Sequence, residues 1–266
     1  MELEFKKSDL EIAVSTMNRA SLDFLIPMFP FGSYSDFNIL IINQTSSGRL
    51  LASELPNIRV INSFAKGLSK SRNLALANAQ KKIVLIADDD AEYLPGFDQD
   101  IIEAFNLNKK AGLICFRTMT KEGMPNRKYR KSKFWMGSRN LIWVLSIEIA
   151  INRCNNKVKN LRFDERFGLG AQFEDSESLF FLREALEKKI KILFFPADIV
   201  VHEKYSSSDE IDSDRWFYAK SASLYRRYGI AAYLFLLKII VFLLRKKIIP
   251  FGQAMPKMKI GLKGIN

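Results

Sequence analysis

The chain has 266 residues, 48% of them hydrophobic, and a formal net charge of +12. This composition excludes global disorder, and the length suffices for one large or two small domains. Residues 215–266 contain 11 of the 41 Lys and Arg residues and none of the 29 Asp and Glu residues. Such asymmetry argues against a nucleic-acid surface over the whole protein and predicts one cationic end that faces an anionic partner.

Three features indicate the compartment. The two cysteines, Cys115 and Cys154, lie far apart in the sequence and are expected to be free thiols in a reducing environment. The opening residues, MELEFKKSDL, lack the apolar region of a signal peptide. No stretch reaches the roughly 18 uninterrupted apolar residues of a spanning helix. We therefore expect a cytoplasmic protein.

Strands and helices are predicted to alternate in the first half of the chain. Strands are expected over 11–16, 37–44, 57–62 and 83–87. Helices are expected over 21–29 and 67–80. This alternation predicts βαβ units and a mostly parallel sheet flanked by helices, an α/β fold.

The second half is predicted to continue the pattern less regularly. We expect helices over 97–106 and 178–189, a strand over 113–117, extended pieces over 190–195 and 199–202, and a strand turning into a helix over 141–152. Residues 121–133 are polar and basic, and they predict a long loop that closes as a lid or binds a ligand. The polar stretch 206–214 is the predicted domain boundary.

The stretch KIVLIADDD, residues 82–90, is the most informative in the chain. Its apolar run predicts a strand buried on both faces of a parallel sheet. Ligands gather at the carboxyl ends of such strands, where Asp88, Asp89 and Asp90 are expected. Three adjacent carboxylates repel one another unless a positive charge is present, and Mg²⁺ binds one or two carboxylates together with substrate phosphates. A solvated acidic turn is the alternative.

A second candidate for phosphate binding is the helix start GLSKSRN, residues 67–73. The free N–H groups of a helix N-terminus favour phosphate, and Lys70 and Arg72 add positive charge. An ordinary basic surface helix explains the same residues equally well.

Five segments in order resemble the family 2 glycosyltransferases with the GT-A (Rossmann-like) fold. They are VSTMNR after the first strand, GLSKSRNLAL, ADDDAEYLPGF, FDERFGLGAQFEDSESLFFL and PADIVVH. The resemblance implies that Asp88–Asp90 form a DXD motif, with Asp90 nearest a divalent metal (Mg²⁺ or Mn²⁺) and Asp88 nearer the ribose. His202, the single histidine, falls where members place a further metal or diphosphate contact; a purely structural role is the alternative.

The same resemblance implies a set of residues that bind the nucleotide sugar. They are Ser15, Thr16, Asn18, Arg19, Asn43, Gln44, Gly67, Arg72, Asn73, Asp88 and Asp89. Many members carry two Asp residues after the second strand, one of which reads the base. Asn43 and Gln44 stand there in this chain, so the identity of the base stays open.

The general base is implied by a Glu-Asp pair that many members carry on the acceptor side. Glu174-Asp175 is such a pair, but counting back from the end of the following helix places Glu177-Ser178 there instead. Asp175 and Glu177 are therefore both candidates. At least one of these acids is expected only to favour a helix N-terminus.

The resemblance thus implies an inverting transfer of a sugar from a nucleotide-diphosphate donor to an acceptor hydroxyl. By analogy the acceptor is a lipid-linked saccharide of bacterial surface polysaccharide synthesis. A metal-dependent nucleotidyltransferase and a non-enzymatic cationic module that binds membrane or nucleic acid are the alternatives. The first would carry a Gly-rich basic loop after its first strand, and the second would not need Asp88–Asp90.

Residues 1–214 are expected to form the catalytic domain and residues 215–266 a basic helical tail. The apolar run 230–244 contains Lys238 and lies between basic and aromatic residues. This pattern is typical of a helix at a membrane interface, so we expect a peripheral protein on the inner face of the cytoplasmic membrane. A helix buried in a core or an oligomer contact is the alternative.

Overall fold

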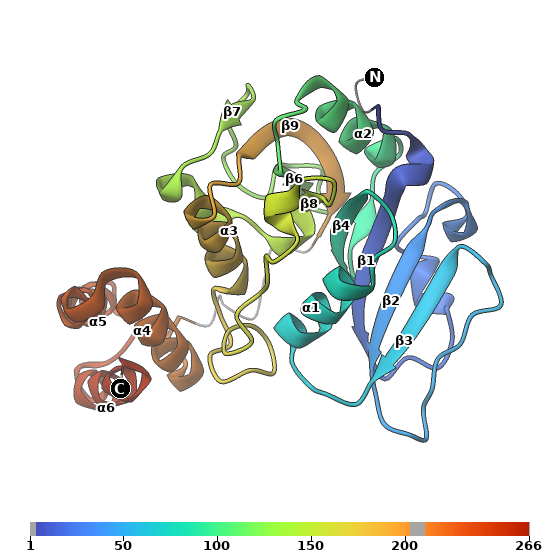
Figure 1. The fold of residues 1–266 in the computed structure, drawn as a ribbon. Coiled ribbons are helices and arrows are strands. Elements are labelled where there is room, and N and C mark those ends of the chain that lie inside the picture. The colour runs from blue at the N-terminus through green and yellow to red at the C-terminus, as the bar shows by residue number, and fades with distance from the viewer. Residues whose placement is uncertain (1–3, 203–210, 266) are drawn as a thin grey trace. The chain divides into compact units, whose positions relative to one another are not determined.

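The computed structural model describes residues 4–202 and 211–265, which divide into two compact units (Figure 1). The first unit comprises Met1–Lys66, Lys70–Phe163 and Ser178–Lys204. The second comprises Gly67–Ser69, Asp164–Glu177 and Tyr205–Asn266. The predicted boundary in 206–214 lies largely outside the described residues. Residues 164–177 are thus grouped with the C-terminal helices.

Half of the central sheet is parallel. Its strand order is β3 (Ile58–Ser63), β2 (Ile39–Gln44), β1 (Leu10–Met17) and β4 (Ile83–Asp88), as Figure 1 shows. All of β2 is buried, and so is β4 except for its last residue. These strands are continuous branched apolar runs because both faces of a parallel sheet are covered.

The other half of the sheet mixes directions. β8 (Ile149–Asn152) runs antiparallel between β4 and β6 (Leu113–Met119), and β6 pairs in parallel with β9 (Ile192–Val201). The short strands β5 (Glu92–Tyr93) and β7 (Phe134–Trp135) both pair antiparallel with β9. All nine strands found in residues 4–202 and 211–265 belong to this one sheet. The predicted α/β fold class is confirmed.

Alternating strand residues form two cores, one on each face of the sheet. Ile12 and Leu85 face the core that contains residues of α2 (Phe97–Leu107). Ala13 and Ile86 face the opposite core, which contains residues of α1 (Leu68–Asn78) and α3 (Glu177–Glu187). The period-two alternation of the strands therefore separates the helices into two layers.

Two predicted elements differ from the structure. Residues 21–29 contain only the 3-10 turn Asp23–Leu25, since Pro27 has no N–H to donate to a continuing helix and its ring clashes with the preceding turn. In residues 141–152 the order is reversed, with 3-10 turns first and β8 last. Short apolar runs of this kind do not distinguish a strand from a helix by periodicity alone.

The last strand also differs, because Pro196 does not end it. β9 runs through this proline to Val201. Pairing with β6 shifts register between Cys115 and Arg117 and again before Thr118. An irregularity of this kind accommodates a residue that has no N–H to donate to the ladder.

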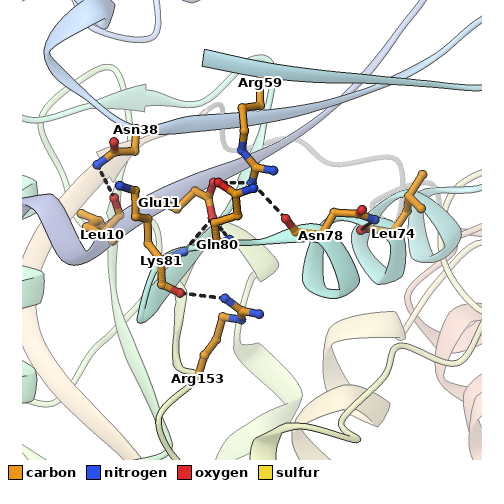
Figure 2. A network of polar contacts seen from close by, with 9 residues as sticks. All are labelled: Leu10, Glu11, Asn38, Arg59, Leu74, Asn78, Gln80, Lys81 and Arg153. Atoms are coloured by element: carbon orange, nitrogen blue, oxygen red, sulfur yellow. Dashed lines mark hydrogen bonds and ion pairs between the residues drawn. The ribbon is translucent and has the colours of Figure 1, made fainter. Parts of the chain in front are cut away.

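A buried carboxylate ties the elements together at the N-terminal end of β1. Glu11 is 2% exposed. One of its oxygens accepts from Arg59 Nη2 at 2.7 Å, and the other accepts from the backbone N–H groups of Gln80 (2.7 Å) and Lys81 (3.2 Å). Arg59 also donates to the carbonyl of Asn78, the last residue of α1. Figure 2 shows this network, which fixes the turn between α1 and β4.

We predict that Glu11→Ala lowers the free energy of unfolding by about 3 kcal/mol. The variant leaves the guanidinium of Arg59 and two backbone N–H groups without their shared acceptor. Urea denaturation followed by circular dichroism measures the change. Glu187→Ala is the matched control, since it removes an exposed i,i+4 pair with Arg183 (3.2 Å) and is expected to cost less than about 0.5 kcal/mol. Equal losses in the two variants would contradict the role given to Glu11.

The C-terminal helices of the second unit form their own core. α4 (Asp214–Tyr228), α5 (Ala232–Arg245) and α6 (Ala254–Ile265) pack around a cluster that includes Phe217 and Leu236. α6 approaches α4 closely, since a Cβ on Gly264 would lie 2.2 Å from the carbonyl oxygen of Tyr218. The predicted tail is therefore a packed helical subdomain.

Candidate active site

Parallel pairing brings the polar ends of three strands to one edge of the sheet. Ser15 of β1 is in register with Asp88 of β4, and Thr16 is in register with Asn43 of β2. The predicted residues of the first, second and fourth strands therefore meet in the first unit. This edge is where ligands bind in open α/β sheets.

Asp88 is neutralised by a buried arginine. Arg72 is 1% exposed, and its Nη2 lies 2.8 and 3.1 Å from the two oxygens of Asp88. The same nitrogen donates to Ser146 Oγ at 2.7 Å, and the guanidinium lies 5.5 Å from the centre of the Phe163 ring. A cation this deeply buried is stable only when it is paired. The arginine is thus fixed on the carboxylate at the end of β4.

Asp89 is neutralised by a different arginine. Its Oδ2 accepts from Arg19 Nη2 (2.7 Å), Arg19 Nε (3.0 Å) and Thr16 Oγ1 (2.5 Å). The backbone of Arg19 is held in turn by the buried amide of Asn43, which accepts from its N–H at 3.1 Å and donates to its carbonyl at 3.0 Å. Asn43 therefore orients the loop that follows β1.

Asp90 differs from its two neighbours in that its side chain is 68% exposed. Its Oδ2 lies 3.4 Å from His202 Nε2, and the hydrogen bond and charge of this histidine hold the pKa of Asp90 below its usual range. Within the described residues, no three His, Cys, Asp or Glu side chains gather into a metal cluster. A carboxylate and an imidazole still fit a divalent cation that takes its remaining ligands from phosphate and water.

Other predicted nucleotide residues of the first unit have internal roles. Ser71 donates to Ser15 Oγ at 2.9 Å, which joins α1 to β1. Asn73 accepts from the N–H of Phe163 (2.7 Å) and donates to its carbonyl (2.9 Å). Gln44 is buried at the end of β2, whereas Asn18 is exposed and has a positive φ of 55°.

Gly67, Asp175 and Glu177 lie in the second unit. Leu68 N–H donates to the carbonyl of Leu169 at 2.8 Å, next to Gly67, whose φ is 123°. Asp175 Oδ2 accepts from Ser176 Oγ (3.0 Å) and lies 3.9 Å from Lys220 Nζ.

The residues around the two candidate bases set their backbone. Glu177 opens α3, directly after Ser176, which has a positive φ of 67°. Gly168 has a φ of 103°, and a Cβ on it would lie 3.0 Å from Ser69 Oγ and 3.3 Å from Glu177 Cβ. This close packing holds the segment 164–177 against the start of α1 inside the second unit.

In each of the two units, residues that contact the predicted ones were not themselves predicted from the sequence. Ser146 bonds Arg72, Lys220 lies beside Asp175, and Asn62 accepts from Asn43 at 3.0 Å. Asn62 lies near the end of a predicted strand, which is a signal for an edge residue. Ser146 and Lys220 have no such signal, since long-range pairing alone places them.

A family model described as glycosyl transferase family 2 matches residues 19–188, more than half of the chain. The chain belongs to glycosyl transferase family 2. The predicted family and the enzyme class, a glycosyltransferase, are thereby confirmed. Among curated proteins, none matches this sequence.

Solved structures support the fold of this family 2 glycosyltransferase. Residues 1–349 of S. aureus TarS are 14% identical to it, with a TM-score of 0.57, and the match covers 96% of this chain and 79% of that one. The complex of the same fragment with UDP-GlcNAc is 13% identical, with a TM-score of 0.58 and coverages of 97% and 81%. The full-length TarS structure matches over 88% of this chain and 43% of its own, with a TM-score of 0.52. The predicted GT-A fold is confirmed.

Proposed function

We propose that this glycosyltransferase transfers a sugar from a nucleoside-diphosphate donor to an acceptor hydroxyl with inversion. The observation that carries the donor side of the proposal is the unequal state of the three carboxylates. Arg72 and Arg19 neutralise Asp88 and Asp89, which leaves Asp90 exposed beside His202. In a family 2 enzyme, this arrangement suits one carboxylate that holds a divalent cation and two that shape the nucleotide pocket.

These contacts suggest a role for each residue of the proposed site. Asp90 and His202 would hold Mg²⁺ or Mn²⁺, which would offset the negative charge that develops on the leaving diphosphate. Thr16, Arg19 and Asn43 are joined by hydrogen bonds, and this group would shape the nucleotide side of the proposed site. Arg72 fixes Asp88 for contact with the ribose. The complexes of TarS with UDP and UDP-GlcNAc make uridine nucleotides the first donors to test.

We predict that binding of a nucleoside diphosphate depends on both a divalent cation and Asp90. Titration calorimetry with UDP, GDP and dTDP, with and without Mn²⁺, should identify one nucleotide that binds only with the metal. Asp90→Asn should abolish the metal-dependent part of the affinity. Asp23→Asn is the control, since Asp23 is a surface carboxylate that bonds Ser21. Unchanged metal-dependent affinity in a folded Asp90→Asn variant would overturn the metal role.

Transfer also needs a base that accepts the proton of the attacking hydroxyl. Asp175 and Glu177 remain the two candidates, and they are separated by one residue at the start of α3. We predict that either Asp175→Asn or Glu177→Gln lowers the transfer rate by about 10²–10⁴-fold while donor affinity stays unchanged. Single-turnover assays measure the rate, and calorimetry measures the affinity. Each variant is the matched control for the other, and wild-type transfer in both would place the base elsewhere.

The C-terminal helices support the further proposal that the enzyme docks on a membrane. α5 buries one apolar face, which contains Ala232, Leu236, Ile240 and Leu243. It exposes a second apolar face, on which Leu234 is 65%, Leu237 49% and Phe242 54% exposed. Lys238 lies on this face, one turn after Leu234 and one turn before Phe242, and Arg245 and Lys246 lie at its C-terminal end; all three are exposed. An apolar face that carries cations suits an anionic lipid surface.

The geometry of these helices favours lying in the interface. Asp214–Arg245 is long and apolar enough, by length and composition, to cross a membrane. However, the chain turns at Gly229, and α5 alone has 14 residues, about 21 Å at 1.5 Å per residue. A hydrocarbon core is roughly 30 Å thick. The proposed location is the inner face of the cytoplasmic membrane, which would suit a lipid-linked saccharide acceptor of surface polysaccharide synthesis.

We predict that the full-length protein floats with anionic liposomes and that Leu234→Glu with Leu237→Glu prevents flotation. Both side chains are exposed, so the double variant should fold, as circular dichroism can confirm. Ile26→Glu with Met124→Glu is the matched control, because these residues are exposed apolar side chains of the first unit. Salt should weaken binding only in part, since screening acts on the cations and not on the apolar face. A monodisperse oligomer that does not float would assign the face to a subunit contact.

A further inference from the structure

The long basic loop, residues 121–133, is held down at its centre by a fully buried carboxylate. Glu148 is 0% exposed, and it lies in the 3-10 turn Ser146–Glu148 just before β8. One of its oxygens accepts from Thr118 Oγ1 at 3.0 Å and from the Tyr129 hydroxyl. The other accepts from Arg127 Nη2 and from the N–H of Leu145 at 3.2 Å. Four donors thus converge on one side chain.

Further contacts fix the same part of the loop. Asn126 N–H donates to the carbonyl of Thr118, and Pro125 forms a bridge with Met119. The Tyr129 ring stacks on Phe194, with ring centres 6.0 Å apart, and the Arg127 guanidinium lies 4.2 Å from the centre of the Tyr129 ring. The expected lid is therefore anchored at its middle. Four exposed cations of the loop, Lys128, Arg130, Lys131 and Lys133, lie on the anchored segment or directly after it.

The turn that carries Glu148 also reaches the carboxylates at the end of β4. Ser146, two residues before Glu148, accepts from Arg72, and Arg72 holds Asp88. One three-residue turn therefore touches both the basic loop and the arginine of the candidate nucleotide pocket. Loss of the Glu148 anchor would release the turn from β6 and from the loop at the same time.

The charge balance around Glu148 makes this anchor strong and sensitive to change. Burial raises the pKa of Glu148, and the charge and hydrogen bonds of Arg127 partly offset that effect. Arg127 is the cation paired with it and is itself only 23% exposed. Removing one member of a buried, fully bonded network leaves its partners unsatisfied, so the effect spreads through the network.

We propose that Glu148 is a positioning residue that couples the basic loop to the donor pocket. It fixes the turn Ser146–Glu148, through which Ser146 keeps Arg72 on Asp88, and it fixes Arg127 and Tyr129 of the loop. The effect of Glu148 on donor affinity rests on the proposed function. Its effect on the loop is independent of any nucleotide.

The first test measures the loop alone. Trypsin cleaves after Lys and Arg, so exposed sites in 127–133 report on the loop directly. Glu148→Gln should accelerate cleavage there at least several-fold, and Tyr129→Phe, which keeps the ring on Phe194, should do so to a smaller extent. Glu11→Gln is the matched control, since it alters the other buried carboxylate of the sheet and lies on β1. The proposal is overturned if Glu148→Gln, folded, is cleaved at the wild-type rate.

The second test measures donor affinity with the nucleotide that binds the wild-type enzyme. Glu148→Gln and Ser146→Ala should each raise its Kd by about tenfold, as for other residues that orient a ligating group. The double variant should lose less than the product of the two effects, since both act through one turn. Glu11→Gln should lower the melting temperature without raising the Kd. An equal rise in Glu11→Gln would show a merely structural effect and would overturn the coupling.

The two tests separate the possible failures. If no nucleotide binds the wild-type enzyme, the proposed function fails, and the cleavage test still decides whether Glu148 anchors the loop. If nucleotide binds and Glu148→Gln leaves its Kd unchanged, the proposed function stands and the coupling falls. Tyr129→Phe replaces Glu148→Gln in both tests if the latter does not fold.

Discussion

The site depends on the repulsion among three consecutive carboxylates at the end of β4 and on how the fold balances it. Arg72 from α1 pairs with Asp88, and Arg19 from the loop after β1 pairs with Asp89. Each arginine comes from a different element, so β4, α1 and the loop after β1 must be correctly placed before the charges balance. Asp90 is then left exposed, with the single histidine of the chain beside it. Folding thus leaves one open carboxylate among three.

Three buried ion pairs have different surroundings at the two ends of the sheet. At the N-terminal end of β1, Glu11 accepts hydrogen bonds from Arg59 and from two backbone N–H groups. At the other end, Arg72 and Asp88 form a pair whose carboxylate side remains 27% exposed. Glu148 lies in the turn whose Ser146 accepts from Arg72, and it binds Arg127 of the basic loop. A buried ion pair therefore fixes the turn between α1 and β4 at the N-terminal end of β1, whereas at the end of β4 a buried ion pair fixes the orientation of Asp88.

Much of the fold and part of the site could be predicted from the sequence. The buried strands were predictable because their apolar runs are continuous, and the carboxylates were predictable because they follow the strand directly in sequence. Residues 21–29 were not, since their apolar spacing fits a helix and only Pro27 opposes it. Ser146 was not either, because its role comes from a contact with Arg72, far away in the sequence. The metal role of Asp90, the roles of Asp175 and Glu177 and the membrane location stay predictions.

Two groups of cations in the C-terminal region, whose positive charge looks uniform in the sequence, have different surroundings in the structure. Cations of α4 pair with acids of the segment 164–177 inside the second unit: Arg226 with Asp164, Arg215 with Glu174 at 3.0 Å, and Lys220 with Asp175 at 3.9 Å.

The cations of α5 and of the turn after it stay exposed beside the outer apolar face of α5. The first group positions the segment that carries both candidate bases, and the second is available to an anionic surface. A chain cut before Arg215 would therefore lose the partners of that segment together with the proposed membrane face. Substitutions on the outer face of α5 separate the two roles, because they leave the pairs of α4 intact.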